Sequence, residues 1–417
     1  MFLFCHPTGN ANVRQAALAL HEAGLLGEFW TSINYEPPAW LERWLPGGFK
    51  AQMKRRSFPP ELSEHIRAFP AKELVRLFAP RAGLRRLVRH ETGPFSVDAI
   101  YSSLDQRAAR RLNVSDFTGV YAYEDGAAHL FRRATELGLR RCYDLPIGYW
   151  RAAREIMSEE AERQPAWAAT IPGNRDSAAK TANKDFELSQ ANVVFVASSF
   201  TLKTLEHAPA YDASVVMIPY GSPRPPQAAP VVAPGLDRRS AGAPLRVLFV
   251  GSLGQRKGLS YLFDACDALG RSVELTLIGT RPGAECKVLD SHLSRHRWIP
   301  SCPHQRVLEE MSQHDVLVFP SLFEGFGLVL LEAMAMGLPI VTTAHTAGPD
   351  LIEDGKEGFI VPIRDSAAIA DKLSWLAADP DRRREMGARA RVRAAEFTWS
   401  AYRQTLSACL ASAALPV

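Results

Sequence analysis

Both halves of this chain alternate short apolar runs with segments that have helical periodicity. The apolar runs are MFLFCH, VYAYED, RCYDLP and NVVFVAS in the first half, and LRVLFVGS, VELTLIG, DVLVFPS, PIVTTA and GFIVPI in the second. Such runs are typical of strands that are buried on both faces, and strands that alternate with helices form parallel sheets. The alternation therefore predicts an α/β protein whose parallel sheets are covered by helices.

A proline-rich stretch separates the two halves. Residues 222–244, SPRPPQAAPVVAPGLDRRSAGAP, contain six prolines and little periodicity, as a linker would. The 417 residues also exceed what one core usually supports. We predict an N-terminal domain over residues 1–235 and a second domain over residues 236–399. A helix over residues 400–417 either completes the second domain or crosses back to the first.

Charge and cysteine content narrow the class of protein. The net charge of +4 is too small to argue for a nucleic-acid partner. The six cysteines include no CxxC pair, which indicates a reducing compartment and no structural metal. The chain opens in a predicted strand, without the regions of a signal peptide, and no apolar run is long enough to span a bilayer. We expect a cytoplasmic protein, with peripheral contact to the inner face of the membrane as a further option.

The possible membrane contact depends on residues 40–93. This stretch has twelve Lys or Arg against five Glu, interleaved with apolar side chains. The apolar residues are Trp40, Trp44, Leu45, Phe49, Phe58, Leu77 and Phe78. One interpretation is a set of solvated helices. The other is a basic, partly apolar surface that contacts an anionic membrane or a phosphate-bearing acceptor.

A possible anion site follows the first strand of the second half. The strand ends at Gly251, and SLGQRKG then leads into a helical pattern. Amides at a helix start carry partial positive charge, so Arg256 and Lys257 are unfavourable there unless an anion meets them. A pyrophosphate held by these amides and two cations, without a metal ion, is one interpretation. A solvated surface loop is the other.

Two carboxylates lie in unusual surroundings in SLFEGFGLVLLEAMAMGLP, residues 321–339. Glu324 is in a loop among glycines, whereas Glu332 is inside an apolar segment that we predict to be a helix. A buried carboxylate is costly unless it is paired. Glu332 is therefore expected to accept hydrogen bonds from hydroxyls such as a ribose diol, and Glu324 from a second hydroxylated ring. The alternatives are a satisfied carboxylate near the helix terminus and a solvated loop acid.

The loop between the two glutamates also favours a ligand. Gly325 and Gly327 permit the backbone to approach a ligand closely. The helix is predicted to begin near Leu328, so the amides around Phe326 form a second helix start that suits an anion. A nucleotide, a pyrophosphate and a polyol together describe a sugar nucleotide.

On these residues the sequence resembles a known family. EGFGLVLLE, from Glu324 to Glu332, together with VLVFPS before it and AMAMGLPIV and GPDLIEDGKEGFIV after it, resembles the family-four retaining glycosyltransferases of the GT-B fold. VGSLGQRKG is similar to the first strand–loop–helix of their donor domain. The resemblance covers roughly residues 185–400, and its E-x7-E spacing is specific.

The resemblance implies two Rossmann-like domains that face a cleft, with the donor on the C-terminal domain and the acceptor mostly on the N-terminal one. It implies retaining transfer of a sugar from a UDP- or GDP-linked donor to a hydroxyl of a glycan, polysaccharide or lipid-linked acceptor. Neither a metal ion nor another cofactor is implied. Glu324, Arg256 and Lys257 are the expected catalytic residues, and Glu332, Gly325, Phe326, Gly327, Leu328, Gly251 and Ser252 the expected donor-binding positions.

Two features depart from the family pattern. Many members have an arginine directly after the strand glycine, where this chain has Ser252. Either Arg256 supplies that charge, or the diphosphate binds more weakly. Many members also have a histidine in the N-terminal domain, where this chain has the strand ends YAYEDGAAH and CYDLPIGYW. Glu124, Asp125 and Asp144 at these strand ends either replace the histidine or cap the following helices.

Two further segments complete the predictions. CHPTGNANVRQAALAL gives a third strand–loop–helix, and the resemblance implies that Gly9 and Asn10 at its turn border the acceptor and the donor phosphate. Asp379 and Asp381 mimic a D-x-D metal motif, but an aspartate followed by a proline opens a helix naturally. We therefore predict a helix cap there.

The pattern leaves two alternatives to a transferase. A sugar-nucleotide epimerase or hydrolase of the same fold would turn over its substrate without an acceptor, because a fold does not fix a reaction. A non-catalytic subunit that binds a sugar nucleotide is the second. The presence of Glu324, Glu332, Arg256 and Lys257 together favours the transferase.

Overall fold

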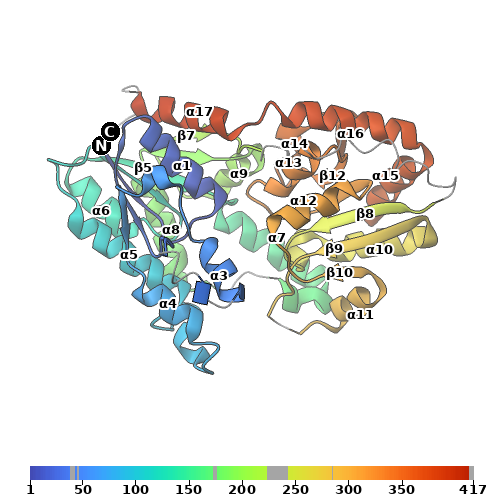
Figure 1. Ribbon diagram of the computed structural model, residues 1–417, viewed down its shortest axis with the longest axis horizontal. Helices are drawn as coiled ribbons and strands as arrows, with labels where there is room; N and C mark the ends of the chain where they lie inside the picture. The colour runs from blue at the N-terminus through green and yellow to red at the C-terminus, as the bar shows by residue number, and fades with distance from the viewer. Residues whose placement is uncertain (38–42, 45–46, 172–175, 223–242, 284, 413–417) are drawn as a thin grey trace.

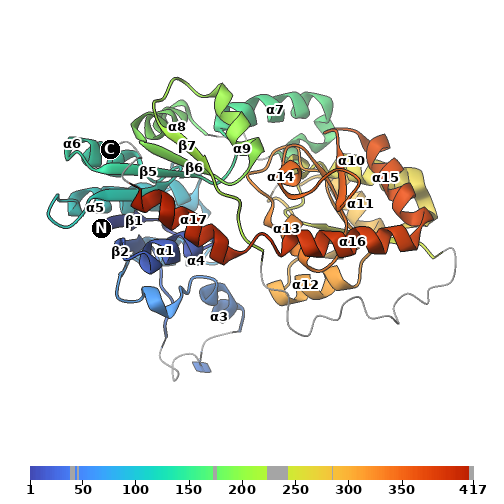
Figure 2. The same ribbon diagram turned by 90° about the horizontal axis from the view of Figure 1, so that it is seen from above.

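The computed structural model describes residues 1–37, 43–44, 47–171, 176–222, 243–283 and 285–412. They form two α/β lobes that lie side by side (Figures 1 and 2). Every strand pairing in both sheets is parallel, so the predicted α/β fold is confirmed. The domain boundary predicted near residue 235, with most of the proline-rich stretch, lies outside the described residues.

The N-terminal sheet has seven strands within the described residues, in the order β3-β2-β1-β4-β5-β6-β7. The strands are β1 Phe2–Cys5, β2 Leu26–Thr31, β3 Ile66–Ala68, β4 Gly119–Tyr123, β5 Arg140–Leu145, β6 Val193–Val196 and β7 Ser214–Met217. The helices are α1 Ala11–Glu22, α3 Gly47–Lys54, α4 Ala71–Phe78, α5 Val97–Arg111, α6 Ala128–Glu136, α7 Trp150–Arg163, α8 Ala178–Gln190 and α9 Ser199–Thr204. The central strands β1 and β4 are buried along their whole lengths, which explains their apolar sequences.

The C-terminal sheet has six strands in the described part of the chain, in the order β10-β9-β8-β11-β12-β13. The strands are β8 Leu245–Val250, β9 Val273–Ile278, β10 Arg297–Ile299, β11 Val316–Phe319, β12 Ile340–Thr343 and β13 Gly358–Val361. The helices are α10 Leu259–Leu269, α11 Lys287–Arg295, α12 His304–Ser312, α13 Leu328–Ala335, α14 Gly348–Leu351, α15 Ser366–Ala378, α16 Pro380–Ala394 and α17 Trp399–Ala411.

Each sheet reverses its strand order at one position. In the first sheet the reversal lies between β1 and β4, and in the second between β8 and β11. Loops that leave such a pair of strands diverge and open a crevice at the carboxyl edge, where ligands bind in open parallel sheets. Most of the predicted site residues follow these four strands: Gly9 and Asn10 after β1, Glu124 and Asp125 after β4, Arg256 and Lys257 after β8, and Glu324 after β11.

The C-terminal helix crosses back to the first lobe. α17 follows the helices of the second sheet in sequence, yet it lies along α1 (Figures 1 and 2). Arg403 donates hydrogen bonds to Glu22 at 2.8 Å and to Gln15 at 2.6 Å, and Ser407 donates one to the carbonyl of Ala19 at 2.8 Å. The sequence left open whether this helix completes the second domain or crosses back to the first, and in the structure it crosses back.

A second segment crosses in the opposite direction. α7 and the 3₁₀ helix η3, Pro165–Thr170, lie between β5 and β6 of the first sheet in the chain but contact the second lobe. Glu160 of α7 has no exposed surface, and it accepts hydrogen bonds from Gln255 at 2.7 Å, Tyr261 at 3.0 Å and Arg364 at 2.8 Å. Because a buried carboxylate needs such partners, this contact fixes α7 on the C-terminal lobe.

The basic stretch at residues 40–93 is partly core. Phe58 and Leu77 are buried, so they do not belong to the predicted surface. Arg56 and Arg76 pair with the buried Glu73 at 2.8 and 2.6 Å. Trp40 and Leu45 lie outside the described residues. Within the described chain, no helix combines the length and the hydropathy that crossing a bilayer requires.

Candidate active site

Three adjoining pockets run along the carboxyl edges of the two sheets. The first, about 540 Å³, is bordered by Glu124, Trp150, Met157, Lys184, Arg256 and Phe323. The second, about 440 Å³, is bordered by Asn10, Gly251, Ser252, Arg256, Lys257 and Glu324, and it extends over Phe326–Val329. The third, about 210 Å³, is bordered by His6, Asn10, Tyr101, Glu124, Asp125 and Lys180. Shared residues at their borders make the three pockets one cleft between the lobes.

Two cations and one carboxylate meet on the C-terminal side of this cleft. The 3₁₀ helix η5, Gln255–Lys257, carries both cations directly after β8. Lys257 forms an ion pair with Glu324 and lies 4.6 Å from the centre of the Phe319 ring. Arg256 donates to the carbonyl of Phe323 at 2.7 Å and lies 3.5 Å from Glu324. The structure thus brings together the three residues predicted to be catalytic.

The surroundings of these cations favour an incoming anion. Burial, with a further contribution from Arg256, holds the pKa of Lys257 well below its ordinary value. Burial also lowers the pKa of Arg256. A buried cation gains most from an opposite charge, and here two cations share one carboxylate. The second pocket therefore suits a ligand that carries negative charge.

The two glycines of the loop before α13, Gly325 and Gly327, have different structural roles. A Cβ atom on Gly325 would lie 1.9 Å from the carbonyl oxygen of Pro146, so this glycine lets the two lobes approach each other. Its own carbonyl accepts hydrogen bonds from Ser198 at 2.5 Å and Thr201 at 2.9 Å. Gly327 has φ +87° directly before α13, a left-handed conformation that favours glycine. The close approach predicted to serve a ligand at Gly325 serves the interface between the lobes.

Glu332 lies in the second turn of α13, which begins at Leu328 as predicted. Its side chain is 17% exposed, and its Oε1 is 3.8 Å from Nε2 of His304, the first residue of α12. Burial raises the pKa of Glu332, and His304 opposes that rise. Because 3.8 Å is too long for a hydrogen bond, the carboxylate keeps its capacity to accept bonds from hydroxyls. Sequence reasoning did not anticipate His304 as its neighbour.

The N-terminal side of the cleft carries a second group of charges. Lys184 lies 3.5 Å from Glu124 and 3.6 Å from Asp125, and Lys180 lies 3.6 Å from Asp125. Asp176 accepts from both lysines, at 3.2 and 3.3 Å. Sequence reasoning missed these lysines, although their spacing of four residues on α8 places them on one helix face.

Glu124 is a buried acid that borders this side of the cleft. Burial raises its pKa to about 7, although Lys184 lowers it. Its Oε1 atom is buried and has no hydrogen-bond partner among the described residues. Asp125 beside it has φ +71°, which is uncommon outside glycine and is found at functional sites. Glu124 is therefore placed to accept a hydrogen bond from a ligand in the cleft.

The alternative that the three acids cap helices is wrong. The first amides of α6 are capped by Asp105, which accepts from His129 at 2.7 Å, and by Glu187, which accepts from Ala127 at 2.9 Å. The helix after β5 is α7, which has no side-chain cap. Asp144 is instead buried within the sheet, where it accepts a hydrogen bond from Tyr121 at 2.6 Å. Burial raises its pKa to about 7, and it borders none of the three pockets.

The turn after β1 contributes a polar edge to the cleft. Asn10 caps α1 by accepting from the amide of Val13 at 3.1 Å, and it also borders the second and third pockets. A Cβ atom on Gly9 would lie 2.7 Å from the Phe58 ring, so packing requires this glycine. His6, which sequence reasoning missed, borders the third pocket, and burial lowers its pKa to about 4.

Comparison with known sequences concerns the second half of the chain. Residues 237–393 match the model of the family described as glycosyl transferases group 1. The D-inositol 3-phosphate glycosyltransferase of Corynebacterium diphtheriae is 31% identical over 221 residues, 46% of this chain and 52% of that protein. The alpha-maltose-1-phosphate synthase of Mycolicibacterium smegmatis is 32% identical over 171 residues, 37% of this chain and 44% of that protein. The chain thus spans about half the length of these curated relatives or less.

Comparison with solved structures covers both lobes. Anabaena Alr3699/HepE, solved in complex with UDP and glucose, aligns with a TM-score of 0.64 at 15% identity over 99% of both chains. The sucrose-phosphate synthase of Thermosynechococcus elongatus aligns with a TM-score of 0.64 at 18% identity over 98% of both chains. At these identities the similarity concerns the fold, and the expected GT-B architecture of two parallel-sheet α/β domains is confirmed.

Proposed function

We propose that this protein, whose residues 237–393 match the model of the glycosyl transferases group 1 family, transfers a sugar from a UDP- or GDP-linked donor to a hydroxyl acceptor. The transfer proceeds with retention and without a metal ion. The observation that carries the proposal is the pairing of Arg256 and Lys257 with a single carboxylate, Glu324, at the carboxyl edge of the second sheet. HepE, of the same fold, was solved with UDP and glucose, which supports a nucleotide-sugar donor.

The proposed reaction requires positive charge next to the donor bond that breaks, which joins the sugar to the diphosphate. As the bond between sugar and diphosphate lengthens, negative charge grows on the leaving diphosphate, and groups that bind this charge more tightly than the ground state accelerate the step. Arg256 and Lys257 are held by Phe323, Glu324 and the ring of Phe319 before any ligand arrives. They therefore meet the charge without costly reorganisation. In this proposal Glu324 stays beside Lys257 and accepts hydrogen bonds from hydroxyls of the donor sugar.

The acceptor in this proposal occupies the pocket of about 540 Å³, which shares Arg256 with the donor pocket. Trp150, Met157 and Phe323 give this pocket apolar walls, and Glu124 gives it a buried acceptor oxygen. Such a pocket suits a sugar ring, which has an apolar face and hydroxyls at its edge. Relatives include enzymes of polysaccharide biosynthesis, such as the amylovoran biosynthesis glycosyltransferase AmsK of Erwinia amylovora. We accordingly assign the acceptor to glycan, polysaccharide or glycolipid synthesis.

A thermal-shift panel tests the donor assignment. UDP, GDP, ADP and their common sugar conjugates are added to the purified protein, with and without EDTA. A nucleotide at about a hundred times its dissociation constant adds about 2.7 kcal/mol, which raises Tm by several degrees. We expect one base to give this shift, unaffected by EDTA. A folded protein that no nucleotide stabilises would contradict the proposal.

A second assay separates a transferase from the alternatives of the same fold. The nucleotide sugar chosen by the panel is incubated with and without candidate hydroxyl acceptors, and release of the nucleoside diphosphate is followed. A transferase releases it much faster with the right acceptor, and the anomeric configuration of the product tests retention. Release that no acceptor accelerates would indicate a hydrolase, and conversion of the donor into another sugar nucleotide without release would indicate an epimerase. Binding without either reaction would indicate a non-catalytic subunit.

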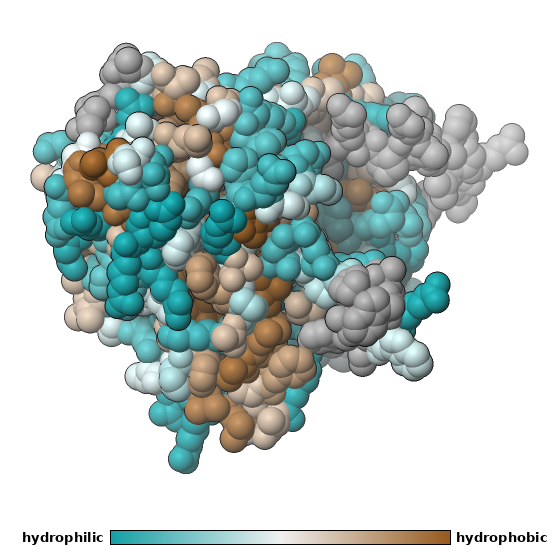
Figure 3. Space-filling view, turned by 60° about the vertical axis from the view of Figure 1, so that its left-hand side comes forward, coloured by the Kyte–Doolittle hydropathy of each residue, from teal (hydrophilic) through white to brown (hydrophobic). Residues whose placement is uncertain are grey.

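We further propose that the N-terminal lobe contacts an anionic membrane at the inner face of the cell. Phe78 and Leu84 are 48% and 52% exposed, and four exposed arginines adjoin them: Arg81, Arg85, Arg86 and Arg89. Hydrophobic side chains also gather on the lower part of this lobe's surface, among hydrophilic ones (Figure 3). Exposed apolar side chains beside arginines suit an anionic lipid surface.

Sedimentation with vesicles of phosphatidylcholine and phosphatidylglycerol tests this contact. We expect binding at low salt that weakens as salt rises, because surface charges are screened. The double variant Arg85→Glu, Arg86→Glu should bind less, whereas Arg382→Glu in an exposed helix of the other lobe should bind like the wild type. Absence of vesicle binding at low salt would remove the membrane from the proposal.

A further inference from the structure

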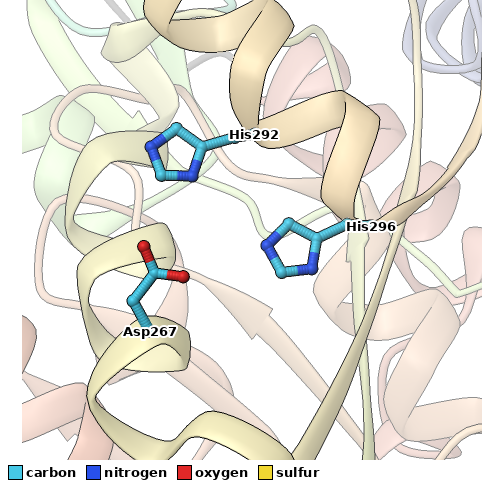
Figure 4. A group of neighbouring side chains, drawn as sticks. All are labelled: Asp267, His292 and His296. Atoms are coloured by element: carbon cyan, nitrogen blue, oxygen red, sulfur yellow. The ribbon is translucent and has the colours of Figure 1, made fainter.

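Two histidines and an aspartate converge on the C-terminal lobe, outside the cleft. Asp267 lies near the end of α10, His292 lies in α11, and His296 directly follows that helix. Their side chains point toward a common space (Figure 4). One ligand atom from each residue lies within 4.8 Å of the others, a spacing that can hold a metal ion. None of the three borders the pockets of the proposed active site.

The two imidazoles are held in place by one aromatic ring. Phe263 of α10 is fully buried and stacks on His292 at 4.1 Å and on His296 at 5.6 Å, with interplanar angles of 10° and 11°. His292 lies in the last turn of α11, and His296 follows that helix directly with an extended backbone, so the end of one helix presents both imidazoles. Rings oriented before binding lower the entropy cost of forming a site.

Arg295 marks the position where positive charge is favoured. Its guanidinium donates to both oxygens of Asp267 at 3.2 Å and contacts Nδ1 of His292 at 2.6 Å. A guanidinium only donates hydrogen bonds, so Nδ1 of His292 presents its lone pair to this space. The Arg295 side chain is 49% exposed and can therefore withdraw to solvent.

His296 adds an unused ligand atom to the same place. Its Nε2 atom is buried and has no hydrogen-bond partner among the described residues. A buried polar atom without a partner is costly, and a metal ion supplies the missing partner. The cluster therefore combines a carboxylate, a lone pair directed at a cation and a nitrogen without a partner.

We propose that Asp267, His292 and His296 bind one divalent transition-metal ion of the zinc class, with water as the fourth ligand, when Arg295 withdraws. Two imidazoles and one carboxylate with an open position are a ligand set that zinc accepts. The same ligand types bind other late first-row ions in the usual affinity order. The bound ion joins α10 to α11.

By joining α10 to α11, the ion would also stabilise the surface that η3 packs against. Trp167 of η3 stacks on Phe263 at 5.9 Å, and Cys286, the residue before α11, donates to the carbonyl of Ala166 at 3.4 Å. The proposed role is therefore structural: it stabilises the lobe and leaves the donor site unchanged.

Zinc titration of the full chain, freed of metal beforehand, tests the proposal. ZnCl₂ is added in competition with a chelating dye, and we expect one ion per chain with a raised Tm. His292→Gln and His296→Gln should each weaken binding by about 10-fold or more. Arg295→Gln should bind more tightly than the wild type, because it removes the competing cation. His207→Gln, at an exposed histidine paired with Glu155, should not change the affinity.

Melting curves without metal show that each variant is folded, and a Co²⁺ titration gives a second readout through its visible bands. Loss of the Co²⁺ bands in both histidine variants supports the site. Equal zinc affinity in the wild type and the histidine variants would overturn it, and so would an Arg295→Gln protein without stoichiometric binding. Neither result affects the proposed donor site, which the nucleotide panel tests separately.

Discussion

Each side of the cleft holds a pair of cations that contact carboxylates, but the two sides have opposite balances of charge. On the C-terminal side, Arg256 and Lys257 share one carboxylate, Glu324. On the N-terminal side, Lys180 and Lys184 lie among four carboxylates, which are Asp98, Glu124, Asp125 and Asp176. Charges of like sign within a few ångströms repel, and opposite ones attract.

In the proposed transfer, this difference suits the two sides of the cleft to different ligands. The C-terminal side keeps an excess of positive charge and suits the diphosphate of a donor. The N-terminal side has its lysines already neutralised, so a phosphate gains little there, whereas a hydroxyl can donate to the unused oxygen of Glu124. Arg256 borders both pockets, so the reacting hydroxyl and the leaving group can meet beside it.

The largest effect is expected from the cationic side. Arg256→Ala should slow sugar transfer by about 100- to 1000-fold, because it removes a preorganised charge from the leaving diphosphate. Transfer is measured as release of nucleoside diphosphate at saturating donor. Lys356→Ala, at an exposed lysine paired with Glu353, serves as the control. A rate within twofold of the wild type would place the diphosphate elsewhere.

The acidic side is tested by Glu124→Gln. We expect transfer to fall by about 100-fold, since the acceptor loses a hydrogen bond to a charged group, while the nucleotide-induced thermal shift stays the same. With its pKa near 7, Glu124 gains charge as pH rises, so the wild-type rate should rise through neutral pH and the variant should lose that rise. Glu136→Gln, at an exposed position, is the control. A loss of nucleotide affinity would contradict the division of roles.

The variant Glu332→Ala tests whether the C-terminal side of the cleft also binds the ribose of the donor. If the carboxylate holds the ribose, the variant should bind the nucleotide about 10-fold more weakly and remain folded. Its folding should be unimpaired because burial already makes this carboxylate costly. Affinity is measured by calorimetry, with Glu309→Ala at an exposed position as the reference. Unchanged nucleotide affinity would falsify the ribose role.

The smallest effect on activity is expected from Asp144→Asn. The carboxyl of Asp144 has a pKa of about 7 in the fold and an ordinary value of 3.8, so the native state binds the extra proton between these values. Wild-type stability therefore falls as pH rises through this window, and the variant should lack that loss. Relative to the wild type it should gain up to about 4 kcal/mol between about pH 4 and about pH 7, measured by urea unfolding.

Transfer by Asp144→Asn should stay within about twofold of the wild type. A loss comparable to that of Glu124→Gln would extend the acidic side of the cleft to Asp144, against its burial within the sheet.

The strands that the sequence predicted are those buried on both faces. All nine predicted apolar runs overlap a strand of the structure, whereas β2, β3, β7 and β10 were not predicted. Three of these four, β3, β7 and β10, lie at sheet edges and have no buried residue. β3 and β10 are only three residues long and lack an apolar run, whereas the short apolar run of β7 was not predicted as a strand. The sequence also predicted a helix cap correctly: Asp379 caps α16, accepting hydrogen bonds from the amides of Asp381 and Arg382.

By itself the sequence determined the local features of this protein: the buried strands, the start of α13 at Leu328, and the residue types that follow β8 and β11. These depend on neighbours within a few residues. Only the tertiary structure decided that Gly325 meets Pro146, that α17 lies on α1, and that Lys180 and Lys184 face Glu124 and Asp125. Such contacts join segments far apart in the chain, and their geometry depends on how helices and lobes pack together, for which no local pattern exists.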